Sequence, residues 1–363
     1  MTDTALNSDL RYQKDSALKP DFSKLSAREL QVYLLQGVSR TFALTIPLLP
    51  SDLLNIIANA YLLCRIVDTI EDEPALIGEE KQLFCKKFEN VIAGKAEAND
   101  FVHELSKRLS HATIPEEHEL IDQTPRVIKI TQSFDKINRD ALEQCVHIMS
   151  EGMVHFQIEK RSYGLKNIKE LDRYCYCVAG VVGEMLTKIF CHYSSAISLN
   201  RDRMLTLSVS FGQGLQMTNI LKDIWEDNSR SACWLPQDIF AKEGVDLKNL
   251  TTIHTDENFS KGLGHLIGIA HMHLENALQY VMLIPKNEKG IRKFCLWNIG
   301  MAILTLRKIN YNRKFTSGVD VKISRLSVKG TILATYLTMR SNQMLKLLFY
   351  LARMRLPYVA SGK

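Results

Sequence analysis

Turn-forming residues are scarce in this chain of 363 residues. It holds nine prolines and 18 glycines, and alternating runs of the kind that form strands are few. Long stretches instead repeat apolar residues with the 3.6-residue period of an α-helix. With 46% hydrophobic residues, the chain can bury a large core. We therefore expect an all-α fold with one large helical domain.

Other signals are missing as well. The eight cysteines form no C-x-x-C pair, which favours reduced, buried thiols in a cytoplasmic protein. The N-terminal segment lacks the apolar stretch of a signal peptide, and no run of 18 uncharged apolar residues predicts a transmembrane helix. The basic residues match no nucleic-acid-binding module, so we expect no nucleic-acid partner.

No repeat, low-complexity segment or long linker divides the chain. We predict a flexible polar leader over 1–24, a helical domain over 25–335 and a basic amphipathic helix or tail over 336–363. A polar stretch over 111–126 is expected to be a break. Helices are predicted over 26–46, 51–72, 78–94, 136–162, 168–194, 201–227, 260–283, 290–312 and 326–354.

Acidic residues are nearly absent from the end of the chain. Residues 301–363 hold twelve Lys or Arg and one acid, Asp320, which gives +11, so residues 1–300 sum to −5 of the total of +6. A tail that mixes leucine, aromatic and basic residues could lie on the anionic, cytoplasmic face of a membrane. Equally, it could dock on the protein body with its basic face in water.

Two acidic segments, 65–72 and 219–227, carry the strongest chemical signal. Each places two aspartates four residues apart in an apolar, helical stretch. Such residues are neighbours on a helix, and their like charges destabilise it unless a cation neutralises them. Mg²⁺ suits this role because it takes one or two carboxylates together with substrate phosphates. A single pair is usually a solvated face, but two pairs with extra oxygen donors favour metal sites; the predicted ligands are Asp68, Glu71, Asp72, Asn219, Asp223 and Asp227.

Basic and hydroxyl groups accompany these acids. Ser39, Arg40 and Thr41 stand together at a helix, and Arg65 and Lys222 lie within the acidic segments. Arginine suits phosphate oxygens through its fork of donors. The set fits an apolar molecule with a diphosphate head, whose departing charge Mg²⁺ and the basic residues would stabilise. A carbocation left behind needs a dry pocket.

A segment over 174–185 contains two glycines three residues apart inside a predicted helix. Glycine there costs about 1 kcal/mol relative to alanine. Gly180 and Gly183 could admit a second helix, or let an apolar ligand lie against bare backbone, and the sequence leaves both readings open. The phenol of Tyr174 could orient a cationic intermediate or help to remove a proton.

Together, these segments resemble the squalene/phytoene synthase family, the head-to-head trans-isoprenyl diphosphate synthases. The resemblance extends from about residue 36 to about residue 329, and its anchors are 39–42, 61–72, 174–183 and 216–237 in family order. It implies an isoprenoid synthase domain with a central active-site cavity. The implied reaction is the Mg²⁺-dependent condensation of two isoprenyl diphosphates, with farnesyl diphosphate as the expected substrate.

The resemblance also implies residue roles. The catalytic residues would be Asp68, Asp72, Tyr174, Asp223 and Asp227, with Glu71 and Asn219 completing the two metal motifs. Diphosphate would be handled by Ser39, Arg40, Thr41, Arg65 and Lys222, the last standing where arginine is usual. The isoprenoid-binding positions would be Phe42, Tyr61, Tyr174, Val178, Ala179, Gly180, Gly183, Leu186, Gln216 and Phe294.

Within the family, the last third of the chain favours the squalene branch. Residues 294–302 look like a diverged third signature of that branch, and Lys322 resembles a position that contacts the nicotinamide cofactor. This implies reduction of presqualene diphosphate to squalene by NADPH, which Arg40, Arg65, Lys222 and Lys322 would bind. The sequence departs from the pattern at Asn298 and Ile299, at Ser324 or Arg325, and at Ala232.

Two alternatives remain. One is condensation without reduction, which would give dehydrosqualene, phytoene or presqualene diphosphate. The other is a non-catalytic helical assembly factor that has kept the fold and lost the chemistry. Survival of all four aspartates favours an enzyme.

Overall fold

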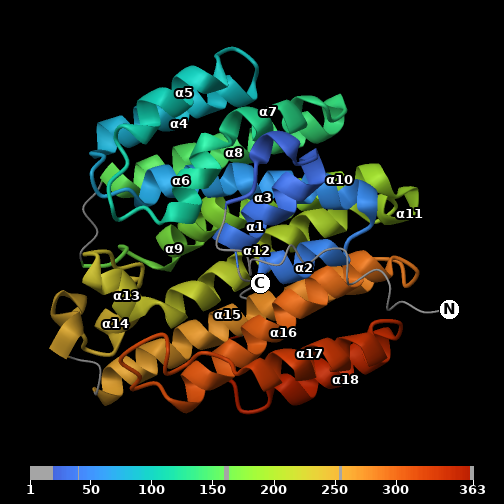
Figure 1. Cartoon of the computed structure of the whole chain (residues 1–363). Helices are drawn as coiled ribbons and strands as arrows, with labels where there is room; N and C mark the ends of the chain where they lie inside the picture. The colour runs from blue at the N-terminus through green and yellow to red at the C-terminus, as the bar shows by residue number, and fades with distance from the viewer. Residues whose placement is uncertain (1–18, 40, 159–162, 253–255, 360–363) are drawn as a thin grey trace. The chain divides into compact units, whose positions relative to one another are not determined.

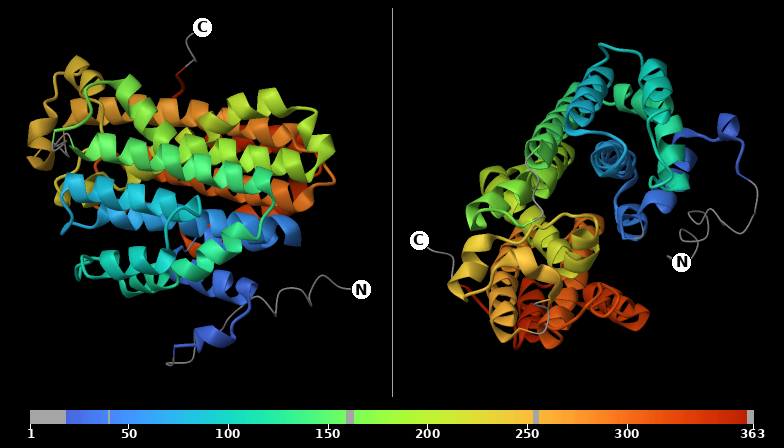
Figure 2. Two further views of the ribbon diagram at one scale, coloured as in Figure 1. Left: turned by 90° about the horizontal axis from the view of Figure 1, so that it is seen from above. Right: turned by 90° about the vertical axis from the view of Figure 1, so that its left-hand side faces the viewer.

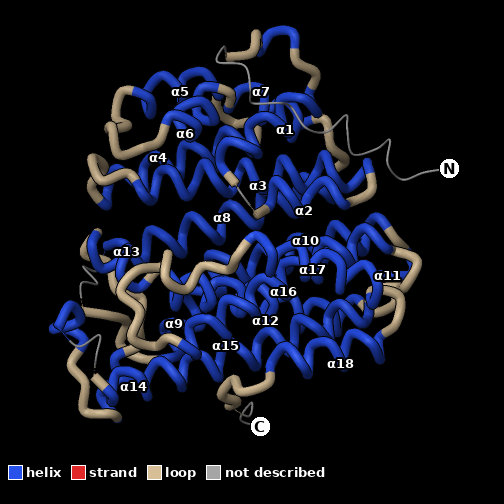
Figure 3. The backbone as a smooth tube through the Cα atoms, turned by 60° about the horizontal axis from the view of Figure 1, so that its bottom comes forward, coloured by secondary structure: helices blue, strands red, loops and turns tan. Residues whose placement is uncertain are grey.

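The computed structural model describes residues 19–39, 41–158, 163–252 and 256–359. Within these ranges the chain forms helices and no strand (Figure 3), and an isolated bridge joins Leu165 to Pro236. The predicted all-α fold is confirmed. Two compact units are distinguished, 1–154 and 155–363, and each is described by itself. The predicted domain over 25–335 stays a prediction.

In the first unit, α3 forms the core (Figure 1). Helices α1, α4, α6 and α7 pack against it, and most of its side chains are buried. The elements of this unit are η1 (Phe22–Lys24), α1 (Ala27–Val38), α2 (Phe42–Thr45), η2 (Ile46–Leu48), α3 (Ser51–Asp72), α4 (Gly78–Ile92), α5 (Ala98–Ser106), α6 (Pro115–Asp122), α7 (Thr124–Gln132) and α8 (Lys136–Ile158), within which the boundary falls.

Local sequence explains where two of these helices begin or end. Ser26 accepts a hydrogen bond from the Glu29 amide, and the Glu29 carboxylate accepts one from the Ser26 amide, so a capping box starts α1. Helix α3 ends at Asp72 because Glu73 precedes Pro74 and adopts an extended conformation. The acidic residues of the first motif therefore occupy the last turns of α3.

The second unit is built around α12, which packs along α15 and against α10 and η3. Helix α16 packs on α15, and α17 packs on α16 (Figure 2). Its elements are α9 (Ile168–Cys175), η3 (Tyr176–Gly180), α10 (Val181–Tyr193), α11 (Ser195–Ser198), α12 (Arg201–Lys222), α13 (Ile224–Ser229), α14 (Gln237–Lys242), η4 (Leu247–Thr252), α15 (Glu257–Leu283), α16 (Lys289–Tyr311), α17 (Arg325–Thr338) and α18 (Asn342–Arg353).

Glycines let α12 approach the α9–α10 segment closely. A Cβ atom at Gly183 would overlap the carbonyl oxygen of Ser208, and one at Gly212 would overlap that of Ala179. Side chains at these positions would push the helices apart. The helix-packing interpretation of Gly183 is therefore supported by geometry.

Arg292 of α16 is fully buried and ties its helix to α15, α17 and α18. Its guanidinium donates to the carbonyl oxygens of Val281 at 3.0 Å, Ile284 at 2.6 Å and Met339 at 2.7 Å, and to the side-chain oxygen of Asn342 at 2.7 Å. These carbonyls belong to the C-terminal ends of α15 and α17, where the helix dipole favours a cation. The pairing offsets the desolvation of the charge.

Several predicted boundaries are corrected. Helices α5, α6 and α7 lie where no helix was predicted, and α6 falls within the expected break over 111–126. The helix predicted over 326–354 is two helices, so a tail beginning at 336 would start inside α17. The helix predicted over 168–194 contains the π-helical turn η3. Most of the predicted leader, 1–18, lies outside the described residues.

Two helical stretches are long and apolar enough to cross a membrane, judged by length and composition alone. They are Ser51–Asp72 and Ile168–Tyr193, and 72% and 61% of their most apolar windows are buried inside the protein. Both contribute to the helical cores described above. Their hydrophobicity is accounted for by this packing.

Candidate active site

One stripe on α3 carries the first motif. Tyr61, Arg65, Asp68 and Asp72 follow one another at spacings of four, three and four residues, so they share a helix face. Asp68 and Arg65 are partly exposed and Asp72 is exposed, whereas the residues between them are buried. The sequence prediction that Asp68 and Asp72 share a face is confirmed.

The stripe has the donor chemistry of a magnesium site. Burial raises the pKa of Asp68 to about 7, Arg65 opposes the shift, and the nearby carboxylates of Asp72 and Glu117 add to it. A divalent cation would relieve this repulsion, so the residues fit Mg²⁺. No group of three or more His, Cys, Asp or Glu side chains with metal-binding geometry is found among the described residues. Two carboxylates suit a Mg²⁺ that also binds phosphate and water.

Glu71 differs from its neighbours in the motif. Its side chain is only 9% exposed and lies off the stripe of Asp68 and Asp72, and its carbonyl oxygen accepts a hydrogen bond from Lys81. Glu71 is therefore not part of the stripe, and its role as a metal ligand stays a prediction.

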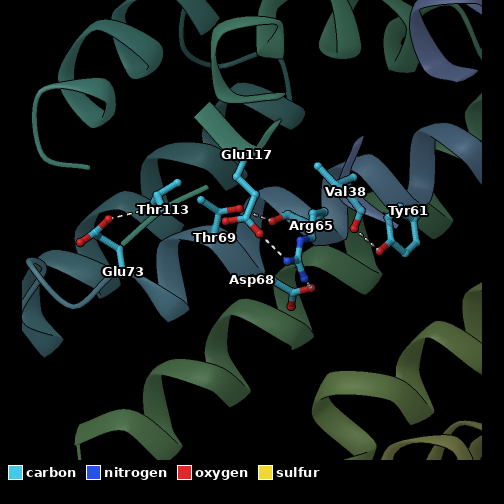
Figure 4. A network of polar contacts seen from close by, with 8 residues as sticks. All are labelled: Val38, Tyr61, Arg65, Asp68, Thr69, Glu73, Thr113 and Glu117. Carbon is cyan, nitrogen blue, oxygen red and sulfur yellow. Dashed lines mark hydrogen bonds and ion pairs between the residues drawn. The ribbon is translucent and has the colours of Figure 1, made fainter. Parts of the chain in front are cut away.

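Arg65 connects the stripe to α6 (Figure 4). Its Nη2 donates to Glu117 in a short ion pair, and its Nη1 lies 3.7 Å from Asp68 Oδ2. Glu117 was not singled out by the sequence, because it lies 52 residues away from Arg65. No local spacing could have related the two.

Glu73, another residue missed by sequence analysis, fixes the loop before α6. Its carboxylate accepts hydrogen bonds from the Ser110 amide at 2.8 Å, the Thr113 hydroxyl at 2.7 Å and the Ala75 amide at 2.8 Å. Burial alone would raise its pKa, but these bonds outweigh it and lower the pKa to about 2. The end of α3 and the 110–113 loop are thus joined through a charged acceptor.

The segment before α3 is organised by hydroxyl and aromatic groups. The Ser39 hydroxyl accepts a hydrogen bond from the Phe42 amide at 3.0 Å, and Tyr61 donates to the Val38 carbonyl at 3.3 Å. The rings of Phe42 and Tyr61 lie 5.2 Å apart. Thr41 is exposed beside them. The predicted Arg40 lies outside the described residues.

The second motif is not on one uninterrupted helix. Asp223 has φ −101° and ψ 16°, and it separates α12 from α13. The prediction of a continuous helix over 201–227 is therefore wrong at this residue. Backbone hydrogen bonds still link Asp223 to Asn219 at 2.9 Å and Asp227 to Asp223 at 2.8 Å. This keeps the three predicted ligands on successive turns, with Asn219 exposed and both aspartates partly exposed.

Basic residues also accompany the second motif. Lys222 Nζ lies 3.0 Å from Asp223 Oδ2. Burial raises the pKa of Asp223, Lys222 lowers it, Glu226 raises it and Arg230 lowers it. The donor set of one amide and two carboxylates fits Mg²⁺ with phosphate oxygens.

Glu226 docks a distant loop onto this motif. Its Oε1 accepts hydrogen bonds from the Gly318 amide at 2.8 Å and the Ser317 hydroxyl at 3.1 Å. A Cβ atom at Gly318 would lie 3.3 Å from Asp223 Oδ1, so the loop backbone is close to the motif. Lys322 is exposed on the turn that follows. The turn that bears Lys322 is therefore anchored on the second motif.

Tyr174 lies in an aromatic stack. Its ring is parallel to Trp234 at 4.0 Å and meets Phe156 edge-on at 5.3 Å. The π-helical turn η3 follows directly, and such turns are frequent at functional sites. Of the other predicted isoprenoid-binding residues, Phe294 and Gly180 are buried, and those that are partly exposed are Val178, Ala179, Gly183, Leu186 and Gln216.

A profile of the squalene/phytoene synthase family matches residues 35–327. The chain belongs to this family. Its members transfer prenyl groups, and the prediction of a prenyltransferase is confirmed. The sequence resemblance stated above is confirmed with it.

Curated relatives agree with the family assignment. Squalene synthase 1 of Arabidopsis thaliana is 29% identical over 295 residues, which cover 80% of this chain and 67% of the relative. The squalene synthase of Eremothecium gossypii is 27% identical over 339 residues, covering 92% and 72%. That of Solanum lycopersicum is 30% identical over 296 residues, covering 80% and 66%. The chain spans about two thirds of the length of these relatives.

Solved structures share the fold. The complex of TcSQS with the ligand E5700 has a TM-score of 0.72 at 23% identity and covers 90% of this chain and 91% of its own. A dehydrosqualene synthase in complex with a ligand has a TM-score of 0.57 at 20% identity and covers 85% and 95%. The predicted isoprenoid synthase fold is confirmed by these likenesses.

Proposed function

We propose that this member of the family is a squalene synthase. It condenses two farnesyl diphosphates head to head to presqualene diphosphate and reduces this intermediate to squalene with NADPH. The similarity to curated squalene synthases over 80% or more of the chain supports this assignment. The observation that carries the chemistry is the stripe of Arg65, Asp68 and Asp72 on α3.

Each acidic motif has a defined role in this reaction. Asp68 and Asp72, and likewise Asn219, Asp223 and Asp227, would hold Mg²⁺, which when bound neutralises the departing diphosphate charge. Arg65 and Lys222 bind diphosphate oxygens directly. Ser39 and Thr41 add hydroxyl donors, and Arg40 is proposed for the same role. Glu71 remains a proposed further ligand.

Aromatic side chains would protect and orient the apolar isoprenoid part of the substrate. The Tyr174 ring, held by Trp234 and Phe156, offers a π face to a carbocation and a phenol oxygen as a proton acceptor. Phe42 and Tyr61 form a second aromatic pair. In the second unit, the half-buried residues of η3 and α10 would help Tyr174 to exclude water from the reactive cation.

The reductive step is assigned to the second unit. NADPH supplies the hydride when bound, and Lys222 and Lys322 of this unit would hold its phosphates. The cofactor-binding roles of Arg40 and Arg65, which belong to the first unit, stay predictions. The turn bearing Lys322 is anchored on Glu226. Two departures from the squalene pattern have structural explanations: Asn298 is buried and donates to the Phe294 carbonyl at 2.8 Å, and Ser324 caps α17.

Incubation of the purified chain with farnesyl diphosphate and Mg²⁺, with and without NADPH, tests the assignment. We expect squalene only when NADPH is present, as identified by mass spectrometry. Dehydrosqualene, phytoene or presqualene diphosphate that is unchanged by NADPH would favour the non-reductive alternative. No product under either condition would favour the non-catalytic alternative.

We also propose peripheral contact with the cytoplasmic face of an anionic membrane. The surface that supports it is formed by α17 and α18. Residues 321–359 hold seven Lys or Arg and no acid. Large apolar side chains on these helices, and Met354 directly after α18, are between 48% and 79% exposed: Leu326, Leu333, Tyr336, Leu337, Met344, Leu347, Tyr350, Leu351 and Met354. Apolar side chains flanked by basic ones suit an interface of acyl chains and anionic headgroups.

Co-sedimentation with vesicles tests this surface. The full chain should bind vesicles that contain anionic lipid and bind neutral vesicles less, with affinity falling as salt rises. Leu347→Glu should weaken binding, whereas Leu199→Glu, at an 87% exposed leucine outside α17 and α18, should not. Equal loss in both variants, or no binding to anionic vesicles, would exclude this surface as the contact.

A cytoplasmic location is part of the same proposal. All eight cysteines are buried, and no disulfide is present among the described residues. Reduced, buried thiols are typical of a reducing compartment. No nucleic-acid partner is proposed.

A further inference from the structure

Arg65 is shared unequally between two carboxylates. Its Nη2 is hydrogen-bonded to Glu117, whereas its Nη1 is 3.7 Å from Asp68, beyond hydrogen-bond distance. The Nε–H group of Arg65 is buried and has no acceptor among the described residues. The hydrogen bond to Glu117 is therefore the contact that fixes the guanidinium in place.

Helix α6 is held in place to deliver Glu117. The Glu73 carboxylate fixes the 110–113 loop to the end of α3, just before α6 begins. At the other side, Gly37 of α1 lies against Glu116, where a Cβ atom would come within 3.1 Å of its Cγ. The first turn of α6 is therefore fixed between α1 and α3. The 8% exposed Glu117 side chain has little freedom to leave Arg65.

Arg65 and Asp68 are three residues apart on one helix, which is a spacing that forms intrahelical ion pairs. Without Glu117, the guanidinium would close onto Asp68 and occupy a carboxylate oxygen that a metal ion needs. Glu117 holds the guanidinium away from this contact. The guanidinium therefore pairs closely with Glu117 and only loosely, without a hydrogen bond, with Asp68.

We propose that Glu117 is a positioning residue that keeps Arg65 off Asp68 and so leaves Asp68 open to a divalent cation. The catalytic meaning of this role rests on the proposed function. The effect of Glu117 on metal binding does not rest on that function, because metal binding can be measured without turnover. Glu117 itself contacts neither the metal nor the substrate.

Mn²⁺ binding to the full chain, followed by electron paramagnetic resonance of the free ion, tests this role. Glu117→Gln should weaken Mn²⁺ binding by about tenfold, the scale of one charge-assisted hydrogen bond. Glu117→Asp keeps the charge but is one methylene shorter, and should give an intermediate loss. Glu119→Gln is the matched control, because Glu119 is on the same helix, is equally buried and pairs with Lys19 at 3.2 Å.

The decisive variant is the double substitution Arg65→Gln with Glu117→Gln. If Glu117 acts through Arg65, removing the guanidinium restores Mn²⁺ affinity to the wild-type value or above. Binding as weak as in Glu117→Gln alone would overturn the proposal, as would equal losses in Glu117→Gln and Glu119→Gln.

Turnover provides a second, independent readout. In Glu117→Gln the Mg²⁺ concentration for half-maximal activity should rise about tenfold while kcat at saturating Mg²⁺ stays close to wild type. A uniform fall in kcat would instead indicate a structural role. If Asp68→Asn binds Mn²⁺ as tightly as the wild type does, the metal assignment itself is refuted. If Glu117→Gln binds Mn²⁺ as tightly as the wild type does, only the role of Glu117 is refuted.

Discussion

The two acidic motifs share a spacing and differ in how the protein holds them. In the first, Asp68 and Asp72 lie on one continuous helix, and the neighbouring cation Arg65 is drawn to a distant acid. In the second, the helix breaks at Asp223, and the neighbouring cation Lys222 pairs with Asp223 itself. A motif defined by residue spacing therefore specifies the donors but not their local partners.

The contacts that hold each motif against neighbouring segments, here called its support, differ as well. Glu73 and Glu117 link the first motif to α6 and the loop before it. Glu226 links the second to the loop that precedes Lys322. In the first unit the support acts on Arg65, the cation proposed to bind diphosphate. In the second it acts on the proposed cofactor-binding turn, so damage to the two supports should have different consequences.

The largest expected effect concerns the aspartates themselves. Asp68→Asn and Asp223→Asn should each lower kcat/KM by at least about a hundredfold, because each removes a charged ligand that stabilises departing diphosphate. Steady-state assays with farnesyl diphosphate would measure this. Asp52→Asn, on the exposed first turn of α3, is the control. Full activity in either variant would remove that motif from the metal assignment.

A second prediction concerns the pH dependence of the helix that carries the second motif. His273 of α15 is buried against α12, where it shares a hydrogen bond with Ser210 at 2.7 Å, and burial lowers its pKa to about 4. The unfolded histidine, with a pKa of about 6.5, takes up a proton first as pH falls. His273 should therefore leave the free energy of unfolding unchanged above pH 6.5 and lower it by about 3 kcal/mol by pH 4, whereas the raised pKa of Asp68 acts in the opposite direction.

Urea unfolding between pH 7 and pH 4 would measure this loss. The difference in unfolding free energy between His273→Gln and wild type should change by about 3 kcal/mol in favour of the variant across that window. His103→Gln, at an exposed position on α5, should leave the wild-type profile unchanged. An unaltered profile in His273→Gln would show that another group controls the acid sensitivity.

A third, smaller effect should separate the two chemical steps. Glu226→Gln weakens the anchor of the loop before Lys322, and hydrogen bonds to a charged acceptor contribute about 1.5–3 kcal/mol. We expect squalene formation to fall about tenfold and presqualene diphosphate to accumulate, as measured by product ratios with NADPH. Glu257→Gln breaks only the exposed pair with Lys314 and should not change the ratio. An equal fall in both steps would contradict the assignment of this loop to reduction.

The smallest effect is expected at Lys222. Lys222→Arg introduces the residue that the family resemblance leads us to expect here, and it preserves the charge beside Asp223. We expect less than about a threefold change in KM for farnesyl diphosphate, because the interaction depends mainly on charge. A large change would indicate that the break at Asp223 tolerates lysine but not the broader guanidinium.

The sequence by itself determined the helical fold and the chemistry of the two motifs. Period and composition indicated that the chain is helical, although they missed α5, α6 and α7. Residues four apart on a helix share a face whatever surrounds them. Asp68 and Asp72 could therefore be paired without a structure. The break at Asp223 and the π-helical turn after Cys175 could not, because neither contains a proline or another local signal that stops a helix at that residue.

Only the tertiary structure decided the partners of these groups. Glu117 meets Arg65 across 52 residues of sequence, and Glu226 meets Gly318 across 92. Gly183 is required by the backbone of Ser208 on another helix. Such contacts depend on how helices are packed side by side, which the periodicity within each helix does not encode.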